Sequence, residues 1–230
     1  MELAPGVYSL TQPQGAFVHA YLIDTSEGLT LIDTLFDLDA HRILEQIQQI
    51  GRKVTDIRHL VLTHAHRAHL GGLKVLKELS GAPVYAHEWE AGIISGERGP
   101  ERVSWLPRGP LATYPAQLVR NLNLDKHPGV PVDRTLADGE SLGPIQVVHA
   151  PGHTLGHLAF YLPERKILFA GDAVVTWPRL IAGWPGFMLD DKQQRDTVRR
   201  LASLDVEVLA TGHGEPVTAR GGEMLRTLVE

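Results

Sequence analysis

The 230-residue sequence contains no cysteine. It therefore has no disulfide framework, no thiolate nucleophile and no cysteine-ligated zinc or iron–sulfur site. Long apolar runs are also missing, because none approaches the roughly 20 residues that a membrane-spanning helix needs. Residues 1–12 lack the basic and apolar regions of a secretory signal. We therefore expect a cytoplasmic protein with no membrane partner.

An excess of basic charge is absent as well. The chain has 22 Lys and Arg against 27 Asp and Glu, a formal net charge of −5. Nucleic-acid-binding domains usually carry a basic stripe, so we expect no nucleic-acid partner. Hydrophobic residues make up 43% of the chain, which is enough to form a core without disulfides. The abundant residue is histidine, with 12 copies, and it directs attention to metal chemistry.

Apolar periodicity predicts alternating strands and helices. Strands are expected at residues 6–12, 17–24, 28–34, 57–64, 82–87, 143–153, 158–172 and 206–214. Helices are expected at residues 38–51, 71–81 and 190–204. Residues 95–135 are rich in Gly, Pro, Trp and Arg without a sustained period, so we predict a loop or helical insertion there. Because no linker separates the two halves, we predict one domain over residues 1–230.

Residues that commonly bind metals follow several of the predicted strands. In α/β folds such loops carry functional side chains, because the rigid sheet behind them fixes their position. Five imidazoles and one carboxylate suit one or two borderline divalent metals such as zinc. An isolated His-x-His pair would indicate a packed core as readily as a metal site. The combination of all six residues is what favours a metal site. The six residues are His64, His66, His69, His153, Asp172 and His213.

The motifs "HAHRAH" (64–69), "PGHTLGH" (151–157), "GD" (171–172) and "GHG" (212–214) resemble those of the metallo-β-lactamase-fold superfamily. The resemblance covers essentially the whole chain, from "YLIDTSEGLTLIDT" to "LATGHGEP". It implies an α+β fold, a four-layer αββα sandwich with the site at one edge between two β-sheets. These motifs are specific for the fold and only weakly specific for the substrate.

The resemblance also implies a ligand set for one or two metal ions, with zinc expected and iron or manganese as alternatives. The first metal would be held by His64, His66 and His153. A second would be held by His69 and His213, with Asp172 bridging both.

Two further residues are implicated behind these ligands. The resemblance suggests that the Asp33 carboxylate orients the histidine loop, although a structural hydrogen bond in the core would leave the same trace. His157 has no ligand role in the family pattern, and we expect it to form a hydrogen bond inside the site loop.

The chain departs from the family pattern at one position. The family's loop usually reads His-x-His-x-Asp-His, and here Ala68 stands in place of the aspartate. Alanine cannot bind a metal or move a proton, and the Arg67 guanidinium has no lone pair to donate. We therefore expect a weaker second metal site and impaired hydrolysis. The chain is then a laboratory variant, a natural one-metal enzyme or a lapsed enzyme that only binds. The intact remaining ligands favour the first.

The leading hypothesis is a metallo-hydrolase in which a metal-bound hydroxide attacks a lactone, ester or thioester carbonyl. N-acyl-homoserine lactonases and glyoxalase II share the ligand set. However, Val175 replaces a tyrosine of the lactonases, and we do not expect the glutathione-binding tail of glyoxalase II. β-Lactamase activity would be at most promiscuous. One alternative is a mononuclear iron persulfide-dioxygenase-like enzyme that uses His64, His153 and Asp172. The other is a non-catalytic metal-binding module.

Aromatic and proline-rich stretches suggest a small-molecule substrate with an apolar chain. Packing of a loop against the sandwich is the competing interpretation of the same residues. The residues in these aromatic and proline-rich stretches are Trp105, Leu106, Trp177, Pro178, Trp184, Pro185, Phe187 and Met188.

A homodimer is a further expectation for this chain.

Overall fold

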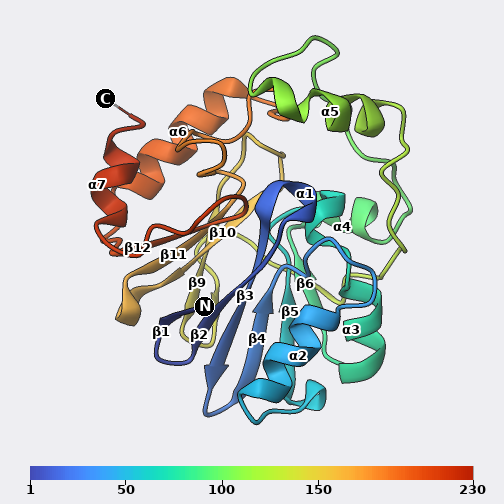
Figure 1. Ribbon diagram of the computed structural model, residues 1–230, viewed down its shortest axis with the longest axis vertical. Helices are drawn as coiled ribbons and strands as arrows, with labels where there is room; N and C mark the ends of the chain where they lie inside the picture. Colours follow the sequence, from blue (N-terminus) through green and yellow to red (C-terminus); the bar gives the residue numbers. More distant parts are fainter. Residues whose placement is uncertain (230) are drawn as a thin grey trace. The chain divides into compact units, whose positions relative to one another are not determined.

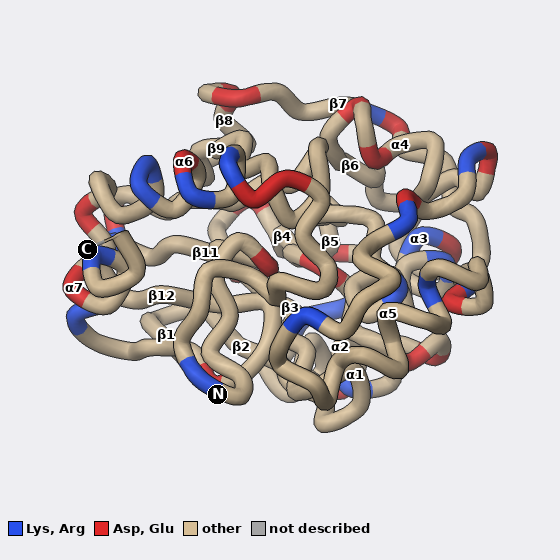
Figure 2. The backbone as a smooth tube through the Cα atoms, turned by 90° about the horizontal axis from the view of Figure 1, so that it is seen from above, with Lys and Arg blue, Asp and Glu red and all other residues tan. Residues whose placement is uncertain are grey.

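The computed structural model describes residues 1–229 (Figure 1). The chain forms two compact units. The first unit contains Met1–Arg98 and His127–Leu136, and the second contains Gly99–Lys126 and the chain from Ala137 onward. Acidic and basic positions are interspersed along the backbone (Figure 2). No helix within residues 1–229 is long and apolar enough to cross a membrane.

The first unit is built on a seven-stranded sheet in the order β1-β2-β3-β4-β5-β6-β7. Pairing is antiparallel from β1 to β4 and parallel from β4 to β7. The strands are β1 (Glu2–Ala4), β2 (Val7–Gln12), β3 (Val18–Thr25), β4 (Gly28–Ile32), β5 (Ile57–Val61), β6 (Val84–Ala86) and β7 (Arg134–Thr135). Its helices are α1 (Gln14–Phe17), α2 (His41–Gln49), α3 (Leu73–Ser80) and α4 (Glu88–Ile94), with 3₁₀ turns η1 (Val54–Asp56) and η2 (Arg67–His69). Helices α2 and α3 lie in the crossovers that parallel strands require.

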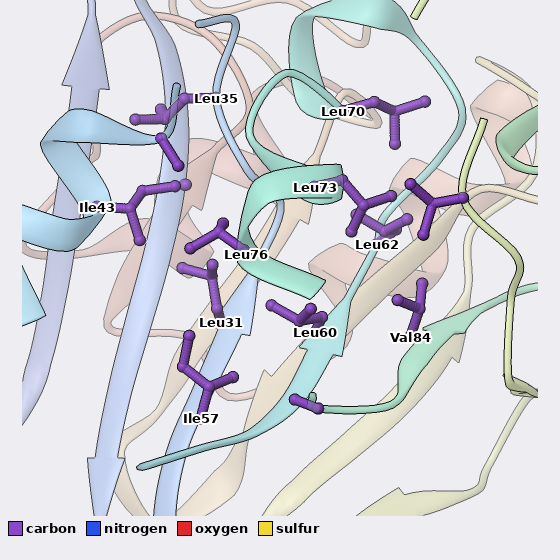
Figure 3. Close-up of a cluster of buried hydrophobic side chains, with 14 of the residues drawn as sticks. Leu31, Leu35, Ile43, Ile57, Leu60, Leu62, Leu70, Leu73, Leu76 and Val84 are labelled. Carbon is purple, nitrogen blue, oxygen red and sulfur yellow. The ribbon is translucent and has the colours of Figure 1, made fainter. Parts of the chain in front are cut away.

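The core of the first unit forms where α2 and α3 pack on the sheet (Figure 3). Ile43 and Ile47 lie four residues apart on α2, and Leu73 and Leu76 lie three apart on α3, so each pair shares a helix face. All four side chains belong to one buried cluster with Leu60 of β5 and other sheet residues. This packing fixes β5, the strand that leads into the histidine loop.

The second unit is built on a five-stranded sheet in the order β12-β11-β10-β9-β8. Its pairs are antiparallel except β11 with β12, whose parallel crossover contains α6. The strands are β8 (Ser141–Leu142), β9 (Ile145–His149), β10 (Leu158–Leu162), β11 (Ile167–Gly171) and β12 (Val208–Thr211). The helical elements are η3 (Leu111–Thr113), α5 (Tyr114–Asn121), η4 (Pro163–Arg165), α6 (Asp191–Ala202) and α7 (Gly221–Arg226). Val198 and Leu201 of α6 and Leu225 of α7 belong to one core cluster with sheet residues such as Leu168.

The two sheets and their helices confirm the predicted α+β class. The three predicted helices are present as α2, α3 and α6, each shorter than expected. The run 158–172 contains two strands, β10 and β11, joined by η4. Residues 95–135 contain η3, α5 and β7, while their membership of a single domain over 1–230 stays a prediction. Helix α4 was missed, because the buried Glu90 interrupts its short apolar face.

Asp133 connects the segment before β7 to α3 and β6. Its carboxylate accepts hydrogen bonds from Lys77 Nζ (2.7 Å) and from the Val84 amide (2.7 Å). Burial raises the pKa of Asp133, but the hydrogen bonds from Lys77 and Val84 outweigh it, so the pKa lies below its ordinary value. A carboxyl group with a lowered folded-state pKa stabilises the fold above its unfolded pKa and loses that effect as the pH falls.

We expect Asp133→Asn to lower the free energy of unfolding by less than about 1 kcal/mol at pH 7, because the ion pair is partly exposed. The difference in the free energy of unfolding between this variant and the unsubstituted protein should fade as the pH falls below about 4, where the carboxyl group of the unfolded chain protonates. Urea unfolding of both proteins between pH 7 and pH 3 measures this difference. A difference that grows toward acid pH would contradict the assignment.

Candidate metal centre

Three histidines of the first unit converge in the loop after β5. His64 and His69 are fully buried and His66 is nearly so. The His64 ring centroid lies 4.4 Å from that of His66 and 4.5 Å from that of His69. Donor nitrogens of His64 and His66 lie within 4.8 Å of each other. The short loop thus brings three potential metal ligands together.

The buried Asp33 carboxylate, which directly follows β4, organises this loop. Its Oδ1 accepts from the Thr63 amide (2.8 Å), and its Oδ2 accepts from Thr63 Oγ1 (2.8 Å) and His69 Nδ1 (2.9 Å). Asp33 adopts a left-handed φ of 60°, a conformation that Asp tolerates better than most residues. The predicted orienting residue therefore contacts one predicted ligand directly and a second through Thr63.

These hydrogen bonds determine which ring nitrogens carry protons. A carboxylate can only accept, so His69 Nδ1 is the protonated nitrogen. Thr63 Oγ1 gives its single proton to Asp33, and so it accepts from His64 Nδ1 at 2.9 Å. Both rings are therefore Nδ1–H tautomers, whose Nε2 lone pair is the atom that binds a metal. Asp33 sets the tautomer of His64 and His69 alike.

A second buried carboxylate supports the loop between the first two histidines. Glu90 of α4 is fully buried, and its Oε2 accepts from the Ala65 amide at 3.0 Å. On the other side of the loop, Thr34 Oγ1 donates to the His69 carbonyl at 2.8 Å. The backbone is thus held at both ends of the histidine sequence.

Arg67 and Ala68 occupy the η2 turn and contact neighbouring parts of the first unit. The Arg67 guanidinium lies 4.3 Å from the Phe36 ring centroid and donates to the Phe36 carbonyl at 2.6 Å. Ala68 is half-buried and packs against the core. A Cβ added to Gly15 of α1 would lie 3.5 Å from the Ala68 Cβ, so α1 passes close to this position.

The second unit gathers its candidate residues at one edge of its sheet. His153 follows β9, while Asp172 and His213 follow β11 and β12. Strands β11 and β12 are parallel, with Gly171 aligned with Thr211, so their carboxyl ends meet at the same edge. His157 precedes β10, the antiparallel partner of β9, and so it reaches this edge too. Sheet topology therefore joins residues that are 60 positions apart.

The Asp172 carboxylate lies at the centre of this group. Its Oδ2 is 3.2 Å from His153 Nε2 and 3.2 Å from His213 Nε2, and all three residues are buried. A Cβ on Gly212 would lie 2.0 Å from Asp172 Oδ1, so only glycine lets the backbone approach the carboxylate this closely. One carboxylate oxygen therefore contacts both imidazoles.

His157 has a different task from the other histidines. Its Nε2 accepts from the Asp172 amide at 3.0 Å, which places the proton of the neutral ring on Nδ1. The residue therefore fixes the backbone from which the Asp172 carboxylate projects. The sequence-based expectation of a hydrogen bond inside the site loop stays a prediction, since this bond reaches the loop after β11 instead.

Aromatic side chains lie beside His213. The Trp184 ring centroid is 4.3 Å from that of His213 and 6.0 Å from that of Phe187. Trp184 Nε1 donates to the Trp177 carbonyl at 2.9 Å, so its polar atom is satisfied and its ring edge is fixed. Of the apolar residues singled out from the sequence, Trp184 and Phe187 are buried, Trp177, Pro185 and Met188 are half-buried, and Trp105, Leu106 and Pro178 are exposed.

The donor chemistry of both units fits a metal cofactor. All six predicted ligands belong to groups of His and Asp that could hold a metal ion. Imidazole nitrogen and carboxylate oxygen are good donors for zinc and for iron, manganese or similar cations. In metal sites, buried imidazole ligands often have their tautomer fixed by a carboxylate. The carboxylate also raises the basicity of the imidazole.

Comparison with known proteins decides the family. The model of the metallo-beta-lactamase superfamily matches residues 14–213. The chain belongs to the metallo-beta-lactamase superfamily. A metallo-beta-lactamase family protein of Thermus thermophilus has the same fold, with a TM-score of 0.72 and 28% identity, over 99% of this chain and 79% of that one. The superfamily and the donor set together support a metal cofactor.

Several relatives are hydrolases. The probable metallo-hydrolase YflN of Bacillus subtilis is 26% identical over 95% of this chain and 88% of its own length. A hydroxyacylglutathione hydrolase of Rhodobacter capsulatus is 28% identical over 84% of this chain, which spans 61% of that protein. The solved structure of TTHA1623 in a di-iron-bound form is 31% identical with a TM-score of 0.66, over 91% of this chain and 93% of that one. These matches support a metallo-hydrolase at the level of the superfamily.

Three residues near the ligands escaped or were underrated by the sequence analysis. The sequence predicts Thr63 only as part of the strand at residues 57–64, although a hydroxyl next to His64 is a signal of a tautomer-setting contact. Glu90 lies on the same helix face as the buried Ile93 and Ile94, and a carboxylate on an apolar face is such a signal. Trp184 was one of eight aromatic and apolar candidates, and nothing in its spacing distinguished it.

We expect Asp33→Asn to weaken zinc binding by about 10–100-fold. The NH₂ group of the asparagine would face the N–H at His69 Nδ1, so two donors would meet. The ring would then favour the tautomer protonated on Nε2, which has no Nε2 lone pair for a metal. Competition titration against a chromophoric chelator measures the affinity, and cobalt(II) absorption reports the ligand geometry. Asp24→Asn is the matched control: it weakens a 2.7 Å contact to Arg52 away from the loop. Equal zinc affinities in the two variants would refute the role of Asp33.

A second prediction concerns Glu90. Glu90→Ala removes the acceptor for the Ala65 amide, so we expect metal affinity to fall about 10-fold. Glu90→Gln retains a carbonyl acceptor and should stay within about threefold of the unsubstituted protein. The exposed Glu88, also in the first turn of α4, supplies the control Glu88→Ala. If Glu90→Gln and Glu90→Ala lose affinity equally, the hydrogen bond to Ala65 is not what positions the loop.

Proposed function

We propose that this protein is a metal-dependent hydrolase of a small molecule with a lactone, ester or thioester carbonyl. The observation that carries the proposal is the hydrogen-bond network behind the donors. Asp33 and Thr63 fix His64 and His69 as Nδ1–H tautomers, and such fixed imidazoles serve to bind metals. Membership of the superfamily and the hydrolase names of several relatives support the same reaction class.

We assign the ligands as the family pattern suggests, with zinc as the expected metal. One metal would be held by His64, His66 and His153, and a second by His69, His213 and the bridging Asp172. When bound, such a cation polarises a carbonyl oxygen and lowers the pKa of a coordinated water. Ala68 contributes no ligand and no proton-transfer group, so the second position would bind more weakly.

Among the candidate substrates we favour a thioester. An acyl group carried on glutathione is a thioester, and hydroxyacylglutathione hydrolases are among the relatives of this chain. The Trp184 ring beside His213, with Phe187 behind it, offers an apolar surface. An apolar wall next to a few polar groups suits the acyl part of such a substrate and limits the access of bulk water.

The remaining residues would act by holding the ligands in place. Asp33 keeps two imidazoles in the metal-binding tautomer, and Glu90 holds the backbone between His64 and His66. His157 fixes the Asp172 backbone, which stabilises the position of the carboxylate. These contacts hold the ligands in fixed positions, so the ligands would need little rearrangement to bind a metal.

Iron is the second candidate for the metal, because the similar structure of TTHA1623 is described in a di-iron-bound form. Independently of that two-iron form, His64, His153 and Asp172 would suit a mononuclear iron oxygenase as a facial triad. Elemental analysis of the purified protein, combined with an oxygen electrode and a persulfide substrate, separates the two. Iron with oxygen uptake would replace the hydrolase proposal.

The decisive experiment restores the family's carboxylate. We expect Ala68→Asp to raise kcat/KM for a hydroxyacyl thioester by about 100-fold or more, the size of one general acid–base contribution. The second metal should also bind more tightly, as measured by metal content after graded chelation. A panel of thioesters, lactones and esters identifies the substrate class.

Ala68→Asn is the matched control, since the asparagine side chain has the shape of aspartate without its charge. We expect it to recover little activity, and thermal unfolding of both variants checks that each one folds. If the folded Ala68→Asp protein takes up no more metal and hydrolyses no member of the panel faster, the role assigned to this position is wrong.

A further inference from the structure

Helix α5 (Figure 1) belongs to the second unit, and its buried residues are polar while several of its apolar residues are exposed. Its buried residues are Gln117, Arg120 and Asn121, of which Gln117 is 0% exposed. Of its apolar residues, Val119 and the C-cap residue Leu122 are exposed, while Leu118 is half-buried. A surface helix normally turns its apolar stripe to the core and its polar residues to water. Packing within this unit therefore does not explain why apolar side chains of α5 face the solvent.

A network of hydrogen bonds holds α5 in this orientation. Asn121 Oδ1 accepts from the Val103 amide at 2.7 Å, and Asn121 Nδ2 donates to the Val103 carbonyl at 3.2 Å. Arg120 Nε donates to the Glu101 carbonyl at 3.2 Å, and its Nη1 contacts Asp125 Oδ2 at 3.4 Å. Rotating the helix to bury its apolar face would break these bonds and leave buried polar groups unsatisfied.

The side chain of Gln117 strengthens this conclusion. Its Nε2 donates to Thr113 Oγ1 and to the Arg108 carbonyl, each at 3.3 Å. A Cβ on Gly186 would lie 1.6 Å from the same Nε2, so the Gly186 backbone packs directly on this amide. The outward face of α5 is therefore presented by a rigid support.

Half of the exposed large apolar residues lie in this one segment. Of the twelve large hydrophobic residues exposed within the described chain, six lie between positions 105 and 124. Leu106 is 74% exposed and Leu111 is 71% exposed. Tyr114 Oη donates to the Trp105 carbonyl at 3.1 Å, which ties the loop before η3 to the start of α5. We name the six residues the α5 patch: Trp105, Leu106, Leu111, Val119, Leu122 and Leu124.

The α5 patch carries almost no uncompensated charge. Between Val103 and Leu124 the charged residues are Arg108 and Arg120. Arg108 pairs with Asp191 at 2.8 Å, and Arg120 is buried. Anionic lipid surfaces and nucleic acids are recognised through clustered basic residues, which this face does not offer. A second copy of the chain presents the same neutral apolar surface, and two-fold pairing needs no complementary charge.

The size of the α5 patch also fits self-association. Its six residues are between 41% and 74% exposed, which together corresponds to an accessible area of about 600–750 Å², against about 800 Å² per partner in a standard interface. A typical monomer exposes a largest apolar patch of about 300–600 Å². We propose that the α5 patch is a homodimer interface, on which a second copy packs its own α5 across a two-fold axis.

Sedimentation equilibrium of the full chain between about 1 and 100 μM tests this proposal. We expect a reversible dimer with a dissociation constant at or below about 10 μM, since interfaces of this size span μM to pM affinities. The double variant Val119→Lys/Leu122→Lys should raise that constant at least 10-fold. Lysine favours helix interiors and C-terminal turns, so α5 itself should remain formed.

Leu79→Lys is the matched control. Leu79 is an exposed leucine in the last turn of α3, in the first unit and outside the α5 patch. This variant should dimerise as the unsubstituted protein does. Circular dichroism of all variants verifies folding.

The absence of cysteine allows a second, independent measurement. Leu111→Cys, Val119→Cys and Leu122→Cys, each tested alone, should give covalent dimers with a short bis-maleimide, while Leu79→Cys should not. A monomer up to 100 μM overturns the proposal, as does a dimer that is unaffected by the lysine variant and cross-links equally at Leu79→Cys. Binding of the monomer to phosphatidylcholine vesicles would instead assign the α5 patch to lipid and overturn it too.

Discussion

The buried Asp33 carboxylate is the interaction on which the histidine loop depends. It accepts three hydrogen bonds, from the amide and the hydroxyl of Thr63 and from the ring of His69. Because a carboxylate cannot donate, a proton is placed on Nδ1 of His69 and, through Thr63, on Nδ1 of His64. One side chain thus fixes both the position and the tautomer of two proposed ligands. A buried charge in this role is stabilised by the donors that surround it.

The second unit reaches a comparable result through its sheet topology. Parallel pairing of β11 with β12 and antiparallel pairing of β9 with β10 bring His153, His157, Asp172 and His213 to one edge. The backbone there is held by the His157 bond to Asp172 and by the close approach of Gly212. Each unit therefore fixes its donors with its own hydrogen bonds.

The same physical rule explains both the metal loop and the α5 patch. Buried polar groups must be paired, and once paired they resist rearrangement. In the loop this rule keeps imidazoles in a metal-binding form. In α5 it keeps Gln117, Arg120 and Asn121 inside, so that leucines remain on the surface. An exposed apolar face that cannot turn inward is best covered by another molecule.

The sequence by itself determined the longer strands, the helices α2, α3 and α6, and the loops that carry the six proposed ligands, but not the short strands β1, β7 and β8. Those features are written in local periodicity and in short motifs, which need no knowledge of distant residues. Only the tertiary structure decided that Glu90 binds the Ala65 amide, that Thr63 relays the effect of Asp33 to His64, and that α5 buries polar residues. These features depend on contacts between residues 18 to 36 positions apart, and no local pattern encodes which polar partner a buried group will meet.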